Sequence, residues 1–414
     1  MEITRRTFVR AGGLALVSFG LDPSFLKRVA LAQENHRRKG HILVSLFQRG
    51  AVDGLSMLVP HADDVYYAKR PRVAIPRGDV IDLDGAWGLH PALSAFEPLW
   101  KRGVLAAVPA CGSPAATRSH FDAQDYMESG TPGVKSTRSG WLNRYCDHAA
   151  TPDDTPFRSV AFGAQLPRSL AGRAHGLAVQ DLRAFGVGGR GRARDKITRA
   201  FEELYQTAAT GVVATSADEA FEAVRTLREV NPSQYVAEHG ADYPQGRLGR
   251  TLQQIAQLIK ADLGLEIAFA DGGGWDTHVA QGASQGQLAN RLREFGDALG
   301  AFALDLGERM RDVIVLTMSE FGRTVAENGS SGTDHGHGTT MFVMGGNVRG
   351  GRVAGAWPGL HEDALFEGRD VAVANDFRDL FGEVLTQHLG VRDLDTVFPG
   401  HANDPARQPR VLRV

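Results

Sequence analysis

Short apolar runs alternate with polar loops and helical patterns along the chain from residue 40 onward. Nearly continuous apolar runs are typical of strands buried on both faces of a parallel sheet, whereas apolar residues spaced three and four apart predict amphipathic helices. The alternation predicts an α/β fold with a mostly parallel sheet. We expect strands at 41–47, 103–110, 265–270, 313–316 and 341–344, and helices at 90–101, 247–263, 287–306 and 376–389.

Residues 150–245 interrupt this alternation. The segment 186–194 is rich in Gly and Arg, and 197–230 has the apolar spacing of an amphipathic helix. We therefore predict one domain over 40–414, with a mostly helical insertion or cap at about 150–245.

Polar side chains follow four of the predicted strands. They are Asp53, Ser119, the pair Asp276 and His278, and Glu320. Because the carboxyl ends of parallel strands lie at one edge of a sheet, we expect these side chains to share a crevice.

The stretch 312–346 adds the densest group of such residues. Its second apolar run is preceded by Asp334, His335 and His337, so the crevice would contain four carboxylates and three imidazoles. Cations are needed to offset the repulsion between so many like charges, and mixed oxygen and nitrogen ligands suit Zn, Mn or Fe(II) better than Ca. Two divalent ions at this edge would polarise an ester oxygen and activate a serine or a water.

Each of these residues also has an ordinary structural explanation. Asp53 and the 334–337 segment fit a turn, and Glu320 fits a helix cap. Ser119 fits a helix N-cap because Asp122 follows it in a capping-box position. Arg118 is suited either to clamping an oxyanion or to a solvated surface.

Composition excludes several classes of protein. A hydrophobic share of 43%, a charged share of 23% and a net charge of −2 are those of an ordinary globular protein and give no support for nucleic-acid binding. Cys111 and Cys146 have no metal-ligand spacing, and the sequence leaves their pairing open.

The N-terminus resembles a twin-arginine export signal. Arg5 and Arg6 precede a weakly apolar stretch at 11–21, and a small-x-small cleavage site lies at 30–32. We predict removal of residues 1–32 and export by the twin-arginine (Tat) machinery to the periplasm or beyond. An anchoring or amphipathic N-terminal helix is the alternative. No other segment has the 18 apolar residues of a membrane span, so none is expected after processing.

Seven motifs across the mature chain resemble the family called domain of unknown function 1501 (DUF1501). They are RGAVDGLS, HPAL, RSHFDAQDYMESG, GGGWDTH, TMSEFGRT, TDHGHG and NDFRDLFGEVL. That family is grouped with the alkaline phosphatase and sulfatase superfamily, so the resemblance implies an alkaline-phosphatase-like, mostly parallel central sheet sandwiched by helices, with a two-metal site. It further implies that Asp53 is the metal aspartate after the first strand, and that Ser119 is the nucleophile.

The resemblance also implies that Asp276 and His278 are the later metal pair, that Glu320 is a ligand, and that His335 or His337 is the final histidine. Three features depart from the superfamily pattern. The pair is Asp-x-His rather than Asp-x-x-x-His, Phe321 follows Glu320 where a histidine is usual, and the Cys/Ser-x-Pro-x-Arg sulfatase signature is absent. A formylglycine sulfatase is therefore not expected.

These observations predict an exported, metal-dependent hydrolase of phosphate- or sulfate-type esters, with a small-molecule or glycan ester as substrate. Ser119 would be the nucleophile, and Arg118 or Arg323 the anion clamp. The predicted metal ligands are Asp53, Asp276, His278, Glu320, Asp334, His335 and His337. The alternative is a non-catalytic envelope binding or assembly protein on the same fold with a degenerate site, which the altered Asp-x-His spacing favours.

Overall fold

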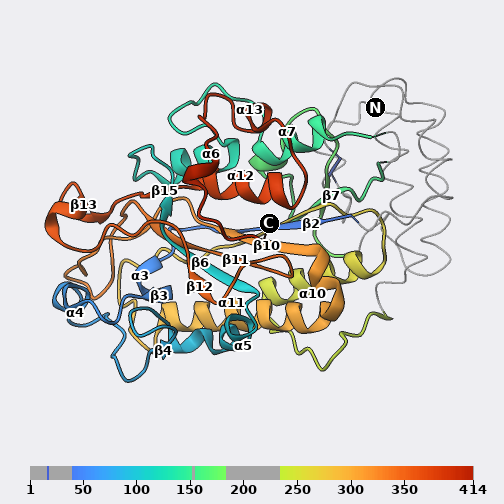
Figure 1. The fold of residues 1–414 in the computed structure, drawn as a ribbon. Coiled ribbons are helices and arrows are strands. Elements are labelled where there is room, and N and C mark those ends of the chain that lie inside the picture. The colour runs from blue at the N-terminus through green and yellow to red at the C-terminus, as the bar shows by residue number, and fades with distance from the viewer. Residues whose placement is uncertain (1–15, 18–39, 152–153, 183–233, 414) are drawn as a thin grey trace, which may run out of the picture. The chain divides into compact units, whose positions relative to one another are not determined.

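The computed structural model describes residues 16–17, 40–151, 154–182 and 234–413 (Figure 1). The predicted export signal at 1–32 lies outside the described residues except for Leu16 and Val17, and so does most of the predicted insertion, at 183–233. The domain boundaries and the export route therefore stay predictions. None of the helices in the described part of the chain has the length and apolarity needed to cross a bilayer.

The chain forms two compact units, of which the smaller draws mainly on residues 138–182 and 254–269. In this unit, β7 (Ser159–Phe162) pairs in parallel with β8 (Leu177–Val179) and with β9 (Ile267–Gly272). The short strand β1 (Leu16–Val17) pairs with β8 in the antiparallel direction. The helix α7 (Trp141–His148) precedes β7, and α10 (Arg247–Lys260) precedes β9.

The larger unit contains residues 41–137, 237–253 and 270–414. The strand order of its main sheet is β2 (Ile42–Gln48), β10 (Val313–Met318), β11 (Thr339–Gly345), β6 (Leu105–Gly112) and β12 (Arg352–Val353), and β15 (Asn375–Asp376) also pairs with β6. The pairs β2–β10, β6–β12 and β6–β15 are parallel, whereas β11 is antiparallel to both of its neighbours. Every residue of β2, β6, β10 and β11 is buried, which explains their continuous apolar runs.

Helices cover both faces of this sheet. Figure 1 shows α11 (Gln287–Leu306) and α5 (Glu97–Lys101) on one face, and α6 (His120–Ser129) and α12 (Phe377–Gln387) on the other. The mixed α/β fold with a mostly parallel central sheet between helices is thereby confirmed. The helix expected at 90–101 is divided into a 3-10 turn at Pro91–Phe96 and α5, because Leu93 leaves helical geometry and Pro98 has no N–H to donate.

The remaining elements of the larger unit are short. Two small sheets, β3–β5–β4 and β13–β14, lie outside the main sheet. These elements are α3 (Gly54–Met57), β3 (Leu58–Val59), α4 (Asp64–Lys69), β4 (Ile81–Asp82), β5 (Gly88–Leu89), β13 (Leu365–Phe366), β14 (Asp370–Val371) and α13 (Leu394–Val397).

Strand direction brings the polar loops of the larger unit together. The strands β2, β6 and β10 run the same way, so their carboxyl ends lie at one edge, and the antiparallel β11 begins at that edge. The hydroxyl of Ser319, directly after β10, donates to the carbonyl of Gln48 at 2.7 Å and accepts from the N–H of Val52 at 3.1 Å. The loops after β2 and β10 are therefore joined at the sheet edge.

Candidate functional site

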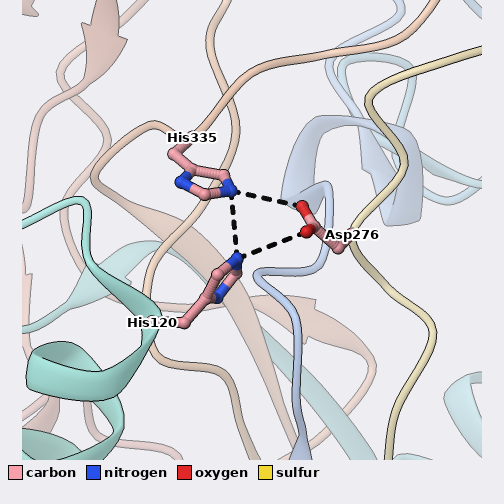
Figure 2. A group of neighbouring side chains, drawn as sticks. All are labelled: His120, Asp276 and His335. Carbon is pink, nitrogen blue, oxygen red and sulfur yellow. Dashed lines mark hydrogen bonds and ion pairs between the residues drawn. The ribbon is translucent and has the colours of Figure 1, made fainter.

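Three imidazole rings and one carboxylate meet at this edge. His120 is the first residue of α6, Asp276 and His278 lie in the loop after β9, and His335 lies before β11. The Nε2 atom of His335 is 3.0 Å from Nε2 of His120, 2.9 Å from Nε2 of His278 and 3.2 Å from Oδ1 of Asp276. Figure 2 shows how His120, Asp276 and His335 point toward one another. We call these four residues the imidazole cluster.

Each histidine of the cluster is held by its other ring nitrogen. The Nδ1 atom of His120 is 2.8 Å from Oε1 of Glu320, that of His278 is 3.0 Å from Oδ1 of Asp334, and that of His335 is 2.9 Å from the carbonyl of Arg118. These oxygens only accept, so each Nδ1 carries the proton and each neutral ring has its lone pair on Nε2.

The lone pairs of the three Nε2 atoms therefore converge on the carboxylate of Asp276. Oδ1 of Asp276 is 2.9 Å from Nε2 of His278, and Oδ2 is 3.5 Å from Nε2 of His120. The three lone pairs and the negative carboxylate repel one another unless a cation or additional protons lie between them. The hydrogen bond to Glu320 raises the pKa of His120, whereas burial lowers the pKa of His335.

A metal ion fits this set of donors. Three imidazoles and one carboxylate are ligands that Zn, Mn and Fe(II) accept. A tetrahedral ion with bonds of about 2.0–2.1 Å separates its ligand atoms by roughly 3.3 Å, and His120, Asp276 and His335 offer ligand atoms 3.0 to 3.5 Å apart. The side chains are 24–43% exposed, so a substrate can reach the cluster.

Glu320 is a buried carboxylate that holds the cluster from behind. It accepts hydrogen bonds from His120, from the N–H of Gly50 and from the side chain of Gln124, each at 2.8 Å. Burial alone would raise the pKa of Glu320, but the hydrogen bonds from His120, Gln124 and Gly50 keep it below its ordinary value. Its position is that of a carboxylate that orients a metal-binding histidine.

Arg323 is buried beneath the cluster. Its guanidinium donates to the carbonyl oxygens of Gly50, Ala51 and Thr333 and forms an ion pair with Asp276. Burial alone would raise the pKa of Asp276, but the Arg323 guanidinium holds it below its ordinary value. Arg323 therefore ties three loops together in this structure, and the anion clamp expected of Arg118 or Arg323 stays a prediction.

Asp53 does not join the imidazole cluster. Its fully buried carboxylate forms a two-pronged ion pair with Arg70, at 2.7 and 3.0 Å, and also accepts from Ser56 and Gln281. These four contacts show that Asp53 is not simply a turn residue and is not a member of the imidazole cluster. It is the buried partner of the Arg70 cation.

His337 also lies apart from the cluster. Its ring is buried and stacks on Phe366, with centroids 4.4 Å apart, and burial lowers its pKa. The residue between the two histidines is Gly336, where a Cβ would lie 2.4 Å from the carbonyl carbon of Arg323. The segment is therefore pressed against Arg323, and only His335 reaches the cluster.

Ser119 and Arg118 flank the cluster. Ser119 is the exposed N-cap of α6, and its hydroxyl accepts from the N–H of Asp122 at 3.5 Å. The guanidinium of Arg118 pairs with Asp370 and Glu367, at 2.6 and 2.7 Å.

Sequence reasoning missed His120 as a site residue. A signal was present, because His120 and Gln124 are four residues apart on α6, and residues at that spacing share a helix face. Both side chains contact Glu320. Arg70 was missed as well, and no pattern around it distinguishes it from the exposed arginines Arg72 and Arg77.

The two cysteines, whose pairing the sequence left open, are both buried free thiols.

Comparison with solved structures finds low similarity over most of the chain. The lipoteichoic acid synthase LtaP from Listeria monocytogenes is 8% identical with a TM-score of 0.37, over 92% of this chain and 78% of that one. The PsFucS1 sulfatase from Pseudoalteromonas sp. is 11% identical with a TM-score of 0.39, over 98% of this chain and 80% of that one. No curated protein sequence matches the chain.

A family comparison is more informative. The model of the family described as protein of unknown function (DUF1501) matches residues 107–402, which is more than half of the chain. The matched region includes His120, Asp276, His278 and His335. The chain belongs to the DUF1501 family, as its motifs predicted.

Proposed function

We propose that this protein is a metal-dependent hydrolase of phosphate- or sulfate-type esters. The observation that carries the proposal is that Nε2 of His335 lies within 3.2 Å of Nε2 of His120, Nε2 of His278 and Oδ1 of Asp276, so that three imidazole lone pairs and a carboxylate converge. The ligands would be His120, His278, His335 and Asp276. A divalent ion bound there would supply Lewis acidity for an ester oxygen.

The surroundings of the cluster suit an anionic ester. The helix α6 begins at His120, and the N–H groups at a helix N-terminus stabilise negative charge. Ser119 is exposed beside the first ligand. We assign its hydroxyl as the nucleophile: Oγ replaces the alcohol of the ester, the alcohol leaves with the proton, and water then hydrolyses the seryl ester.

Glu320, Asp334 and Arg323 have supporting roles in this proposal. Glu320 and Asp334 accept hydrogen bonds from the Nδ1–H groups of His120 and His278 and so fix the orientation of the two rings. Arg323 keeps Asp276 ionised and joins the loops that carry the ligands. Export by the twin-arginine route and a small-molecule or glycan ester as substrate belong to the same proposal.

The proposal is tested by metal removal and by substitution. The purified protein is assayed with aryl phosphates and aryl sulfates before chelation, after chelation, and after return of Zn²⁺ or Mn²⁺. We expect hydrolysis of one ester class that is lost on chelation and restored by metal. His335→Ala should abolish it, whereas His361→Ala, at an exposed position outside the cluster, should leave it unchanged. Activity that survives chelation would remove the metal from the mechanism.

Substitution of the nucleophile provides a second, separate test. Ser119→Ala should lower kcat by several orders of magnitude while metal content stays the same, because Ser119 is not a ligand in this assignment. If Ser119→Ala keeps its full rate, a water rather than Ser119 attacks the ester.

A further inference from the structure

The guanidinium of Arg70 is a buried cation that forms an ion pair with Asp53. Both side chains are almost wholly buried, at 0% and 1% exposed. The Nη1 and Nη2 atoms of Arg70 donate to the two oxygens of Asp53. Such a two-pronged pair is among the strongest hydrogen-bonded arrangements that a carboxylate forms. Ser56 and Gln281 donate to Oδ2 of Asp53 at 2.8 and 2.7 Å. The carboxylate is saturated by protein donors.

Arg70 is saturated in turn. Its Nε atom donates to the carbonyl of Val325 and its Nη2 atom to the carbonyl of Thr324, each at 2.8 Å. Its Nη1 atom also reaches the hydroxyl of Ser56 at 3.3 Å. The guanidinium therefore joins the loop after β2 to the loop after β10, as a metal ion would join ligands from separate loops.

A glutamine links this ion pair to the imidazole cluster. The amide nitrogen of Gln281 donates to Asp53, and its oxygen accepts from the hydroxyls of Thr277 and Thr333, at 2.8 and 2.7 Å. Thr277 is the residue between the ligands Asp276 and His278, and Gln281 is fully buried. The ion pair thus supports the backbone that presents two of the four ligands.

We propose that the site holds a single metal ion, on the imidazole cluster, and that the Arg70 guanidinium takes the place of a second cation at Asp53. This inference rests on the metal site proposed above. It replaces the two-ion expectation with one removable ion and one permanent cation supplied by the chain. Chelation should then empty the cluster and leave the Asp53–Arg70 ion pair and the loops it joins in position.

Metal counting on the native protein is the primary test, and it needs no variant. Chelator-treated protein is titrated with Zn²⁺, and bound metal is measured by elemental analysis after removal of free ions. We expect one ion per chain. Two ions per chain would overturn this inference and leave the proposed hydrolase intact, whereas no bound ion would overturn both.

Two matched substitutions identify the ligand set. With Co²⁺ as the probe, Asp53→Asn should still bind one ion and should keep the wild-type visible spectrum, because the ligands of the ion are unchanged. Asp276→Asn should change that spectrum and weaken binding by about tenfold or more. A second ion bound by the native chain and missing from Asp53→Asn would show that Asp53 is a ligand and would overturn the inference. If Asp53→Asn fails to fold, the ion count on the native chain decides the question.

Discussion

The Nδ1 atom of His120 donates a hydrogen bond to Oε1 of Glu320 at 2.8 Å, across 200 residues of sequence. The side chain of Glu320 is fully buried, whereas that of His120 is 25% exposed. The carboxylate therefore lies behind the ring, and the ring presents Nε2 to the cluster. Glu320 was expected to bind metal directly, but in this structure it orients one of the ligands that we propose.

Glu320→Gln should weaken metal binding while leaving the four proposed ligands in place. The carboxamide is less basic than the carboxylate and brings an N–H₂ group that competes with His120 and Gly50 as a donor. Loss of such an orienting carboxylate lowers metal affinity by about 10- to 100-fold. Competition with a chromogenic chelator measures the change. Glu362→Gln, at an exposed position, is the control and should bind metal like the wild type.

Asp53→Asn should destabilise the protein at neutral pH and alter its response to acid. Removing one partner of a buried ion pair costs about 3–5 kcal/mol. The Arg70 guanidinium and the surrounding hydrogen bonds outweigh burial and hold the pKa of Asp53 below its ordinary value. A carboxyl with a lowered folded-state pKa stabilises the fold above its unfolded pKa of about 3.9, and this stability is lost as pH falls toward the folded-state value.

The acid limb of the stability curve is therefore the measurement for this ion pair. Urea unfolding between pH 7 and pH 3 should show a smaller fall for Asp53→Asn than for the wild type. Asp64→Asn, which breaks an exposed ion pair with Arg77, should follow the wild-type curve. Equal acid sensitivity of wild type and Asp53→Asn would mean that the carboxyl of Asp53 has an ordinary pKa in the folded protein.

The fold was largely predictable because its strands are buried on both faces. The run at 313–316 corresponds to β10 (Val313–Met318), and the helix at 287–306 has the observed bounds of α11. The gathering of Asp276, His278 and His335 could be anticipated as well, because strand ends share an edge.

The partners of each side chain could not be predicted in the same way. Asp53 and Asp276 both follow a strand as isolated carboxylates, but Asp53 meets Arg70, which lies on a short helix end that no periodicity marks. Similarly, His335 and His337 differ only in which side of a tightly packed glycine they occupy. The direction in which each side chain points is set by tertiary contacts, and the spacing of residues in the sequence does not determine it.

Gly336→Ala should disturb the cluster through the backbone. The added Cβ would lie 2.4 Å from the carbonyl carbon of Arg323, so the segment that carries His335 must move away. We expect a loss of about 1–3 kcal/mol in the free energy of unfolding, as for other overpacked positions, together with weaker metal binding. Thermal unfolding with and without Zn²⁺ measures both effects. Gly329→Ala is the matched control, since a Cβ there meets nothing within 4 Å.

Phe121→Ser should affect substrate binding without affecting stability. Phe121 follows His120 on α6 and is 90% exposed, so its ring covers no core. If the ester reaches the cluster beside α6, the ring contacts its leaving group, and an aromatic contact of about 0.5–1.5 kcal/mol corresponds to a two- to tenfold change in KM. We expect a higher KM for aryl esters, little change for methyl esters, and an unchanged melting temperature. Leu304→Ser, which alters a half-exposed side chain on α11, is the control and should leave the KM for aryl esters and for methyl esters unchanged. An unaltered KM for aryl esters in Phe121→Ser would place the leaving group on another side of the cluster.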